Sequence, residues 1–506
     1  MNILKRNFKI WLLILIGTVM WSLTMVKSGL IYDYGMGFWG PNGHDGVWHV
    51  ALASSLARGS LDMPIFASEK IKNYHLGFDL VLAGLHNISR IPIVNLYFQI
   101  LPPIFAILIG WLVYKLTNNL WSVFFVYFGG SLGWMFGGGE SMFWAQQSMS
   151  TLINPPFALS LILLLAGLLL IKNKKYWWAG LVFAVLPHIK IYAGLLAFGG
   201  LLVAGLKDRN LYKSFFIGVS IYLTSNLQLL TSNFQLLVYK PAWFLETMMA
   251  LSDRFNWPRF YEAMINYKAA GNYFKAISAY TVALGIFVVG NMGTRIIGLL
   301  RPKNIFYSSI ICAGLIIPMF FVQSGTAWNT IQFFYYSIFF MGILAGESIQ
   351  KFPKLLKVII IIMTIPTAIQ TLPHYLPNRP PAKISTEELE ALSFLSKQPT
   401  GTVLTYPAVV KDTQAPRPLY EYESTAYVSA FSNNPSFLED EVNLNIMGYA
   451  WQARRKSVDE YWKNPSNKFL VDNNISYVYI IKNSENISLD MPNIFENSKI
   501  AIYKIK

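Results

Sequence analysis

The feature that most constrains this chain is a series of apolar runs, each about 17–20 residues long, that recurs between residues 10 and 372. An α-helix of this length crosses the hydrocarbon core of a bilayer, which is about 30 Å thick. Charged residues make up only 13% of the 506 positions, against about 25% in an average soluble chain. We therefore expect a mainly α, polytopic transmembrane protein with about eleven spans.

Basic residues indicate the orientation of these spans. Lys5, Arg6 and Lys9 precede the first run, and further lysines and arginines follow later runs, which places the N-terminus and those turns in the cytoplasm. The net charge of +15 arises before residue 373, so it reflects cytoplasmic loops, and we expect no nucleic-acid partner. The expected spans are 10–26, 93–116, 119–136, 156–172, 177–190, 191–206, 214–230, 278–299, 304–322, 331–346 and 355–372, with external loops 27–92, 137–155 and 231–277.

The composition changes after the last expected span. "STEELEALSFLSK" opens with a capping box, Ser385 followed by Glu388, and is typical of a helix. "TVLTYP", "SYVYIIK" and "KIAIYKI" are typical of strands. We expect a transmembrane domain at 1–372 and a small extracytoplasmic α/β domain at 373–506. Residues 75–91 could form an extra short crossing of the membrane. In that case, either 93–116 or 119–136 would not be a full span.

The external loop after the first span contains "GPNGHDGVWHVALASSLARG". Asp45 is placed to cap the helix that it opens. Trp48 and two leucines at i+4 spacing form an apolar stripe, which predicts a helix lying along the membrane surface. Asp45 and His49 share one face, one turn apart. Either Asp45 only caps and His49 is a surface histidine, or both contact a substrate.

Other polar residues of the external face are candidates for the same site. His44, His49, His75 and His188 all map to this face, but their spacing matches no zinc pattern. Glu140 is the only charge of its loop. It is either a solvated carboxylate or a second acid, and together with Asp45 it could hold a divalent cation, Mg²⁺ or Mn²⁺.

Lys190 lies in "VLPHIKIYAGL", inside a long apolar region with cytoplasmic lysines at both ends. The chain must therefore turn near Pro187, which brings His188 and Lys190 to the outer face. A lysine at this depth is costly unless it meets an anion. The anion is either a protein carboxylate or a lipid-linked phosphate.

Two further external segments mix polar and aromatic residues. In the loop 231–277, Arg254 and Arg259 alternate with tryptophan, phenylalanine and tyrosine, and "QSGTAWNTIQFFYY" carries Trp328, Asn329 and Gln332. Such residues either anchor the loops at the membrane interface or bind sugar and phosphate groups.

In the order and spacing of these elements the chain resembles the C-type membrane glycosyltransferases (the GT-C superfamily). These include protein O-mannosyltransferases and lipid A aminoarabinose transferases. The resemblance extends loosely over the membrane part and the external C-terminal domain. The residues that carry the resemblance are Asp45 after the first span, an Ala-rich helix that ends at Arg58-Gly59, "DMP", and "YHLGFDLVLAGL". A glycine follows Asp45 where many relatives have a second acid, and Tyr-His replaces a Lys-Pro-Pro-like element.

The resemblance implies a polyprenyl-phosphate sugar donor and a glycan, lipid or protein acceptor, in contact with membrane lipids. Asp45 would be the general base that takes the proton of an acceptor hydroxyl, and the sugar would transfer with inversion. The departing phosphate needs cations, for which Lys190, His188, His75 and Arg58 are the candidates. The remaining candidates are Glu140 as a second acid and substrate contacts at His44, His49, Arg254, Arg259, Trp328, Asn329 and Gln332.

Two other classes of function stay open. The interruption at Pro187 is typical of transporters and flippases, which use broken helices, although the chain shows no internal repeat. A non-catalytic envelope assembly protein, whose tail binds a partner, is the third hypothesis. All three place the chain in the cell membrane.

Overall fold

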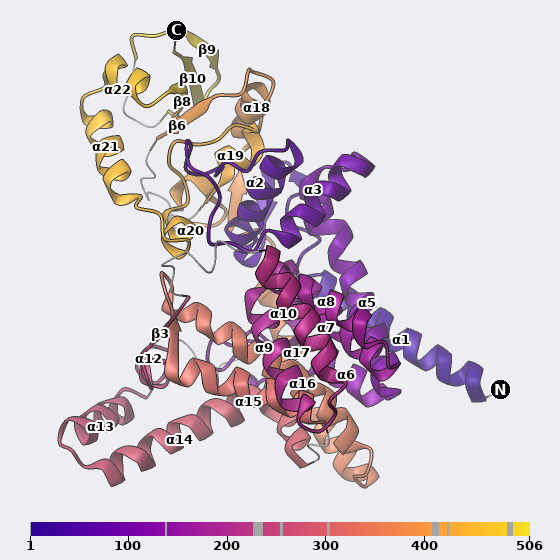
Figure 1. Ribbon diagram of the computed structural model, residues 1–506. Helices are drawn as coiled ribbons and strands as arrows, with labels where there is room; N and C mark the ends of the chain where they lie inside the picture. The colour runs from indigo at the N-terminus through magenta and orange to yellow at the C-terminus, as the bar shows by residue number, and fades with distance from the viewer. Residues whose placement is uncertain are drawn as a thin grey trace. The chain divides into compact units, whose positions relative to one another are not determined.

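The computed structural model describes residues 2–136, 139–225, 236–252, 257–300, 304–406, 414–422, 425–482 and 489–505 (Figure 1). The chain is mostly helical, with several apolar helices and a strand-containing C-terminal region, as the sequence predicts. It divides into two compact units. The helical unit comprises Met1–Thr24 and Pro102–Tyr375, and the mixed unit comprises Met25–Leu101 and Leu376–Lys506.

In the helical unit, a helix corresponds to each expected span. α16 packs against α6, α9, α14 and α15, and almost all of its side chains are buried. Small residues permit these close contacts, because a Cβ on Gly314 would lie 2.5 Å from the carbonyl oxygen of Phe333. The helices are α1 (Asn2–Ser22), α5 (Leu101–Thr117), α6 (Leu120–Phe128), α7 (Pro155–Lys172), α8 (Tyr176–Ile189), α9 (Ile191–Gly205), α10 (Leu211–Ser225), α12 (Trp243–Leu251), α13 (Pro258–Ala269), α14 (Tyr273–Met292), α15 (Ile305–Phe320), α16 (Gln332–Ile349) and α17 (Lys354–Tyr375).

Four helical stretches of the described residues are long and apolar enough to cross a membrane: Ile93–Thr117, Pro155–Lys172, Tyr273–Leu300 and Lys354–Tyr375. Four shorter helices are also apolar: Phe8–Ser22, Tyr176–Ile189, Ile191–Gly205 and Ile305–Phe320. The chain is therefore an integral membrane protein.

One expectation about the spans is wrong. The segment 119–136 is α-helical only in α6, nine residues long, which at 1.5 Å per residue covers less than half of a bilayer core. Near the end of the expected span 278–299, the side chain of Arg295 is only 1% exposed. Its guanidinium donates to the carbonyl oxygens of Gly129, Asn291 and Met292.

The mixed unit contains two four-stranded sheets. One has the order β1 (Ile31–Tyr32), β2 (Gly35–Phe38), β5 (Ala382–Ile384), β7 (Arg417–Pro418), so it joins the loop after the first span to the C-terminal region. The other has the order β6 (Thr402–Thr405), β8 (Ile475–Ile481), β10 (Ile500–Lys504), β9 (Asn493–Glu496). The domain boundary expected at residue 373 is inferred from a change in composition. The two units are defined by packing and do not test it, so that boundary stays a prediction.

The helices of the mixed unit include those expected from the sequence. Ser385 and Glu388 form the predicted capping box at the start of α18 (Thr386–Leu395). The others are α2 (Asp45–Ala57), α3 (Gly77–Ser89), the short helix α4 (Ile93–Asn95) followed by the π-helical turn η2 (Leu96–Ile100), α19 (Tyr427–Ser432), α20 (Glu441–Ile446), α21 (Gln452–Lys463) and α22 (Asn467–Asp472).

The helix α2 is not the expected surface helix. Every residue from Gly46 to Leu56 is buried, because α2 packs against α3, α4 and α19 on different sides. Its small residues allow this burial. The apolar stripe therefore marks only one face of α2, whereas the structure buries the helix on all sides.

Candidate functional site

The turn before α2 is fixed by a serine of the preceding segment. Ser28 Oγ accepts hydrogen bonds from the backbone N–H of Trp39 and from Asn42 Nδ2, both at 2.9 Å. Gly43 completes the turn, and a Cβ there would lie 3.0 Å from a methyl group of Leu419. These contacts place His44 and Asp45 at the start of the buried helix.

Asp45 is the first residue of α2 and does not cap it as predicted. The N-cap position is taken by His44, whose side chain makes no capping hydrogen bond. Instead, His44 Nδ1 lies 2.6 Å from Asp45 Oδ1. The Asp45 side chain is 46% exposed, so its carboxylate is accessible although the helix that follows is buried. A negative charge in the first turn also interacts favourably with the helix dipole.

Asp440 is a third ionisable residue of this site, and the sequence analysis missed it. It is 2% exposed and caps α20, accepting from the backbone N–H of Asn443 at 3.2 Å and from Asn443 Nδ2 at 2.7 Å. Its charge acts on His44 and Asp45. The spacing of Asp440 and Asn443 could have revealed the cap, but nothing local in the sequence indicates the proximity to His44.

The protonation of these groups follows from their surroundings. Burial opposes the charged form of His44, but the hydrogen bond to Asp45 and the charges of Asp45 and Asp440 outweigh it and raise the pKa of His44. Burial raises the pKa of Asp440, an effect that His44 and Asn443 partly offset. The contact between His44 Nδ1 and Asp45 Oδ1 thus fixes the direction of the Asp45 carboxylate.

His49 pairs with Asp79, although it lies only one turn from Asp45. His49 Nδ1 is 2.7 Å from Asp79 Oδ1 of α3, and both side chains are buried. The imidazole also stacks on Tyr97 at a centroid distance of 5.7 Å. The pair His49–Asp79 thus joins α2 to α3 inside the mixed unit, and Asp79 was not among the predicted residues.

The two other predicted cations of the mixed unit lie at its periphery. Arg58 is exposed and donates from Nη1 to Asn433 Oδ1 at 3.1 Å. His75 is half-buried, and its ring packs edge-on against Tyr74 with the centroids 4.6 Å apart.

In the helical unit, Glu140 is buried rather than solvated, with 8% exposure. Its Oε1 accepts from the backbone N–H of Ser150 at 2.8 Å and from Ser150 Oγ at 2.7 Å, and Tyr375 donates to Oε2 at 3.4 Å. Burial raises the pKa of Glu140, and these hydrogen bonds partly offset the effect. The charge of buried Arg295 acts on the same carboxyl group.

Lys190 lies at the predicted turn, between α8 and α9. It has an extended backbone and is 5% exposed. Its Nζ donates to Asn154 Oδ1 at 3.4 Å and lies 5.6 Å from the ring centroid of Tyr192. His188 Nε2 lies 3.0 Å from Ser225 Oγ of α10. The break thus places a buried ammonium next to the N-cap of α7.

Of the remaining predicted residues of the helical unit, Trp328 lies in an aromatic cluster. Trp328, in the 3₁₀ turn Ala327–Ile331, packs edge-on against Trp144 and Trp243, with centroids 4.4 and 4.9 Å away. Asn329 and Gln332 follow it and are half-buried. Arg259 is exposed on α13, and Arg254 lies outside the described residues.

The divalent cation expected at Asp45 and Glu140 stays a prediction. Among the described residues, no three histidine, cysteine, aspartate or glutamate side chains come close enough to hold a metal.

No family model matches the sequence, and no curated protein matches it. The structure is similar to the apo form of the Archaeoglobus fulgidus oligosaccharyltransferase, with a TM-score of 0.49 and 9% identity over 93% of this chain and 69% of that chain. It is also similar to ArnT from Cupriavidus metallidurans in the apo state (TM-score 0.41) and bound to undecaprenyl phosphate (TM-score 0.40). Both are 11% identical over 97% of each chain.

Proposed function

We propose that this chain is an integral membrane glycosyltransferase that moves a sugar from a polyprenyl-phosphate donor to an acceptor hydroxyl on the external face. The observation that carries the proposal is the carboxylate of Asp45, which is 46% exposed at the start of a buried helix and is fixed by His44. A general base needs this combination of access and fixed direction. The sequence resemblance described above supports the same class of reaction.

In the proposed reaction, Asp45 takes the proton of the acceptor hydroxyl. The hydroxyl oxygen attacks the anomeric carbon of the donor and forms the new glycosidic bond. The bond from the anomeric carbon to the phosphate oxygen breaks, its electron pair leaves with the lipid phosphate, and the configuration inverts.

The anionic lipid phosphate that leaves requires positive charge. Lys190 is the strongest candidate, because its ammonium group is buried at a helix break, where a positive charge favours an anionic ligand. His188, His75 and Arg58 are further candidates. Glu140 is proposed as an auxiliary acid.

The test is reconstitution of the full chain in vesicles with polyprenyl-phosphate sugars, with released lipid phosphate as the readout. Asp62→Asn is the matched control, because Asp62 is an exposed carboxylate of the same unit that pairs with Lys70 on the surface. We expect Asp62→Asn to turn over like the wild type and Asp45→Asn to lose turnover. Equal turnover by both variants would remove Asp45 from the reaction.

The helix break at Lys190 also favours a second candidate, a lipid-sugar flippase. The same vesicles distinguish the two functions. A flippase would move the intact lipid-linked sugar across the bilayer without releasing lipid phosphate, and an envelope assembly protein would do neither.

A further inference from the structure

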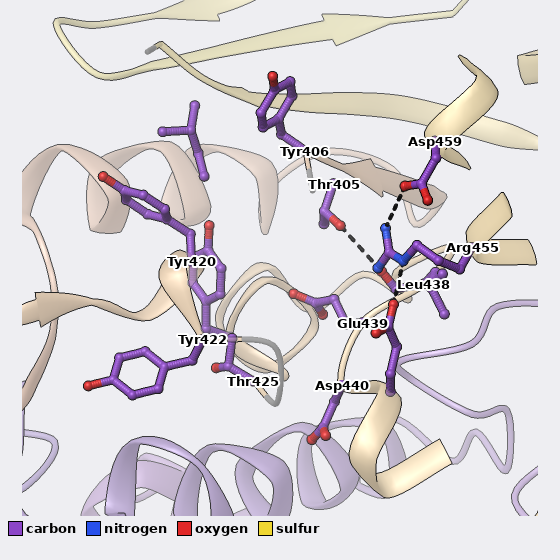
Figure 2. Close-up of a pocket in the computed structure, with 13 residues that line it drawn as sticks. Thr405, Tyr406, Tyr420, Tyr422, Thr425, Leu438, Glu439, Asp440, Arg455 and Asp459 are labelled. Atoms are coloured by element: carbon purple, nitrogen blue, oxygen red, sulfur yellow. Dashed lines mark hydrogen bonds and ion pairs between the residues drawn. The ribbon is translucent and has the colours of Figure 1, made fainter. Parts of the chain in front are cut away.

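The mixed unit contains a cavity of about 280 Å³. It lies between the end of β6 and the starts of α19 and α20, and α21 closes one side. Figure 2 shows Tyr420, Tyr422 and Thr425 on one side and Arg455 with Asp459 on the other, with Glu439 between them. Its volume is near the lower end of the range for small-molecule sites.

Four tyrosines line this cavity: Tyr406, Tyr420, Tyr422 and Tyr427. Tyr427 is 4% exposed, and Tyr422 donates its hydroxyl to the carbonyl oxygen of Pro381 at 3.2 Å. A tyrosine offers an apolar ring face and a polar hydroxyl at once. A sugar needs both, because its C–H faces are apolar and its rim is made of hydroxyls.

The acidic groups that line the cavity outnumber the basic groups. Arg455 pairs with Glu441 and with Asp459, the latter at 3.7 Å. Glu439 and Asp440 add two carboxyl groups without a second cation among the described lining residues. This excess favours a neutral ligand rich in hydroxyl donors and disfavours an anionic one.

Glu439 lines the cavity, and hydrogen bonds hold its carboxyl group in place. It is 7% exposed and accepts from the backbone N–H groups of Val428 and Ser429, both at 3.0 Å, and from Ser436 Oγ at 2.7 Å. Burial raises its pKa to about 7, although these hydrogen bonds lower it. A network of this kind fixes a side chain in one position.

Thr425 supplies independent evidence for a ligand. It lines the cavity, is 6% exposed, and its Oγ1 has no hydrogen-bond partner among the described residues. Buried hydroxyls are almost always hydrogen-bonded in folded proteins. A ligand hydroxyl in the cavity would provide the missing partner.

Asp440 connects the cavity to the catalytic candidates. It lines the cavity, and its charge acts on both His44 and Asp45. We propose that the cavity binds the acceptor of the sugar transfer, and that the acceptor presents a neutral sugar residue there, with Thr425, Glu439 and the tyrosines as its contacts. The acceptor role rests on the proposed function, whereas sugar binding by the cavity does not.

Binding is tested on the full chain in nanodiscs by saturation-transfer-difference NMR. The probes are the methyl glycosides of glucose, galactose, mannose and N-acetylglucosamine, with methyl glucuronide as the anionic counterpart. We expect at least one neutral glycoside to bind more tightly than the glucuronide. Thr425→Val should raise its Kd about five- to tenfold, the effect of one lost hydrogen bond.

The matched control is Thr386→Val, because Thr386 is exposed on α18 in the same unit, and its Kd should equal that of the wild type. Tyr420→Ala is the second variant, and thermal unfolding verifies that each variant is folded. The inference is wrong if no neutral glycoside binds, if the glucuronide binds equally well, or if Thr425→Val and Tyr420→Ala both bind like the wild type.

Turnover separates this inference from the proposed function. If both hold, Thr425→Val raises the acceptor KM and leaves the release of lipid phosphate at saturating acceptor unchanged, whereas Asp45→Asn stops that release. Wild-type binding without turnover would contradict the proposed function alone. Turnover that depends on Asp45 with an unchanged KM in Thr425→Val would contradict the acceptor site alone.

Discussion

His44 responds to two carboxylates that differ in exposure. The Asp45 side chain is 46% exposed, whereas Asp440 is buried. The accessible carboxylate can meet a substrate, and the charge of the buried one contributes to the raised pKa of His44. The local sequence made His44 and Asp45 candidates, but it placed Asp45 beside His49 and not beside His44. It could not indicate Asp440, which the fold brings in from almost four hundred residues away.

The raised pKa values of His44 and Glu439 predict how stability depends on pH. The folded state binds protons more tightly than the unfolded state at both groups, so their contributions are lost as the pH rises. For Glu439 the loss falls between its usual pKa of 4.5 and about 7, at up to about 1.4 kcal/mol per unit of raised pKa. For His44 it begins at 6.5 and continues through the raised value.

Thermal unfolding of the wild type, Glu439→Gln and His44→Gln between pH 4.5 and 8 measures these two losses. We expect Glu439→Gln to flatten the lower part of the profile and His44→Gln to flatten the upper part. Identical profiles for all three proteins would contradict the assignment.

The buried pair His49–Asp79 predicts that the loss of the Asp79 carboxylate costs more unfolding free energy than the loss of the exposed Asp62 carboxylate. Asp79→Ala leaves His49 without this partner inside the core and should cost about 1–3 kcal/mol of unfolding free energy. Asp62→Ala removes an exposed partner of Lys70 and should cost less than about 1 kcal/mol. Chemical denaturation in detergent compares the two, and equal costs would mean that His49 is solvated.

At the scale of elements, most helices could be predicted and their surroundings could not. The apolar runs, the capping box at Ser385 and the strand patterns of the tail identified the elements near their observed positions. The burial of α2 on all sides was missed, because its partners α3, α4 and α19 come from distant segments. A stripe of large residues is visible in a sequence, whereas a face of alanines and serines gives no such signal.

Close packing against Phe98 leaves no space for a side chain at Gly46, near the start of α2. A Cβ at this position would lie 2.5 Å from Phe98 Cζ, so a second acid after Asp45 does not fit. Gly46→Ala should therefore destabilise the chain by about 1–3 kcal/mol. Gly84→Ala in α3 is the control, because a Cβ there meets no atom within 4 Å, and it should be neutral or stabilising. Similar thermal shifts in both variants would contradict this packing.

At the scale of the whole molecule, the proposed function requires that Asp45 faces the exterior. Cys312 is the only cysteine, so a Cys312→Ser background permits single-cysteine labelling. Asp62→Cys should react with a membrane-impermeant maleimide in intact cells, and Asp208→Cys should react only after permeabilisation. The reverse pattern would place the loop 27–92 in the cytoplasm.

The central claim is that Asp45 removes the acceptor proton in a sugar transfer from a lipid phosphate, and one measurement tests it most directly. Lipid phosphate release is followed in vesicles that contain folded wild type, Asp45→Asn or Asp62→Asn, with a polyprenyl-phosphate sugar and an acceptor. We expect release by the wild type and Asp62→Asn, and a loss of at least about a hundredfold in Asp45→Asn. Undiminished release by Asp45→Asn would contradict the claim.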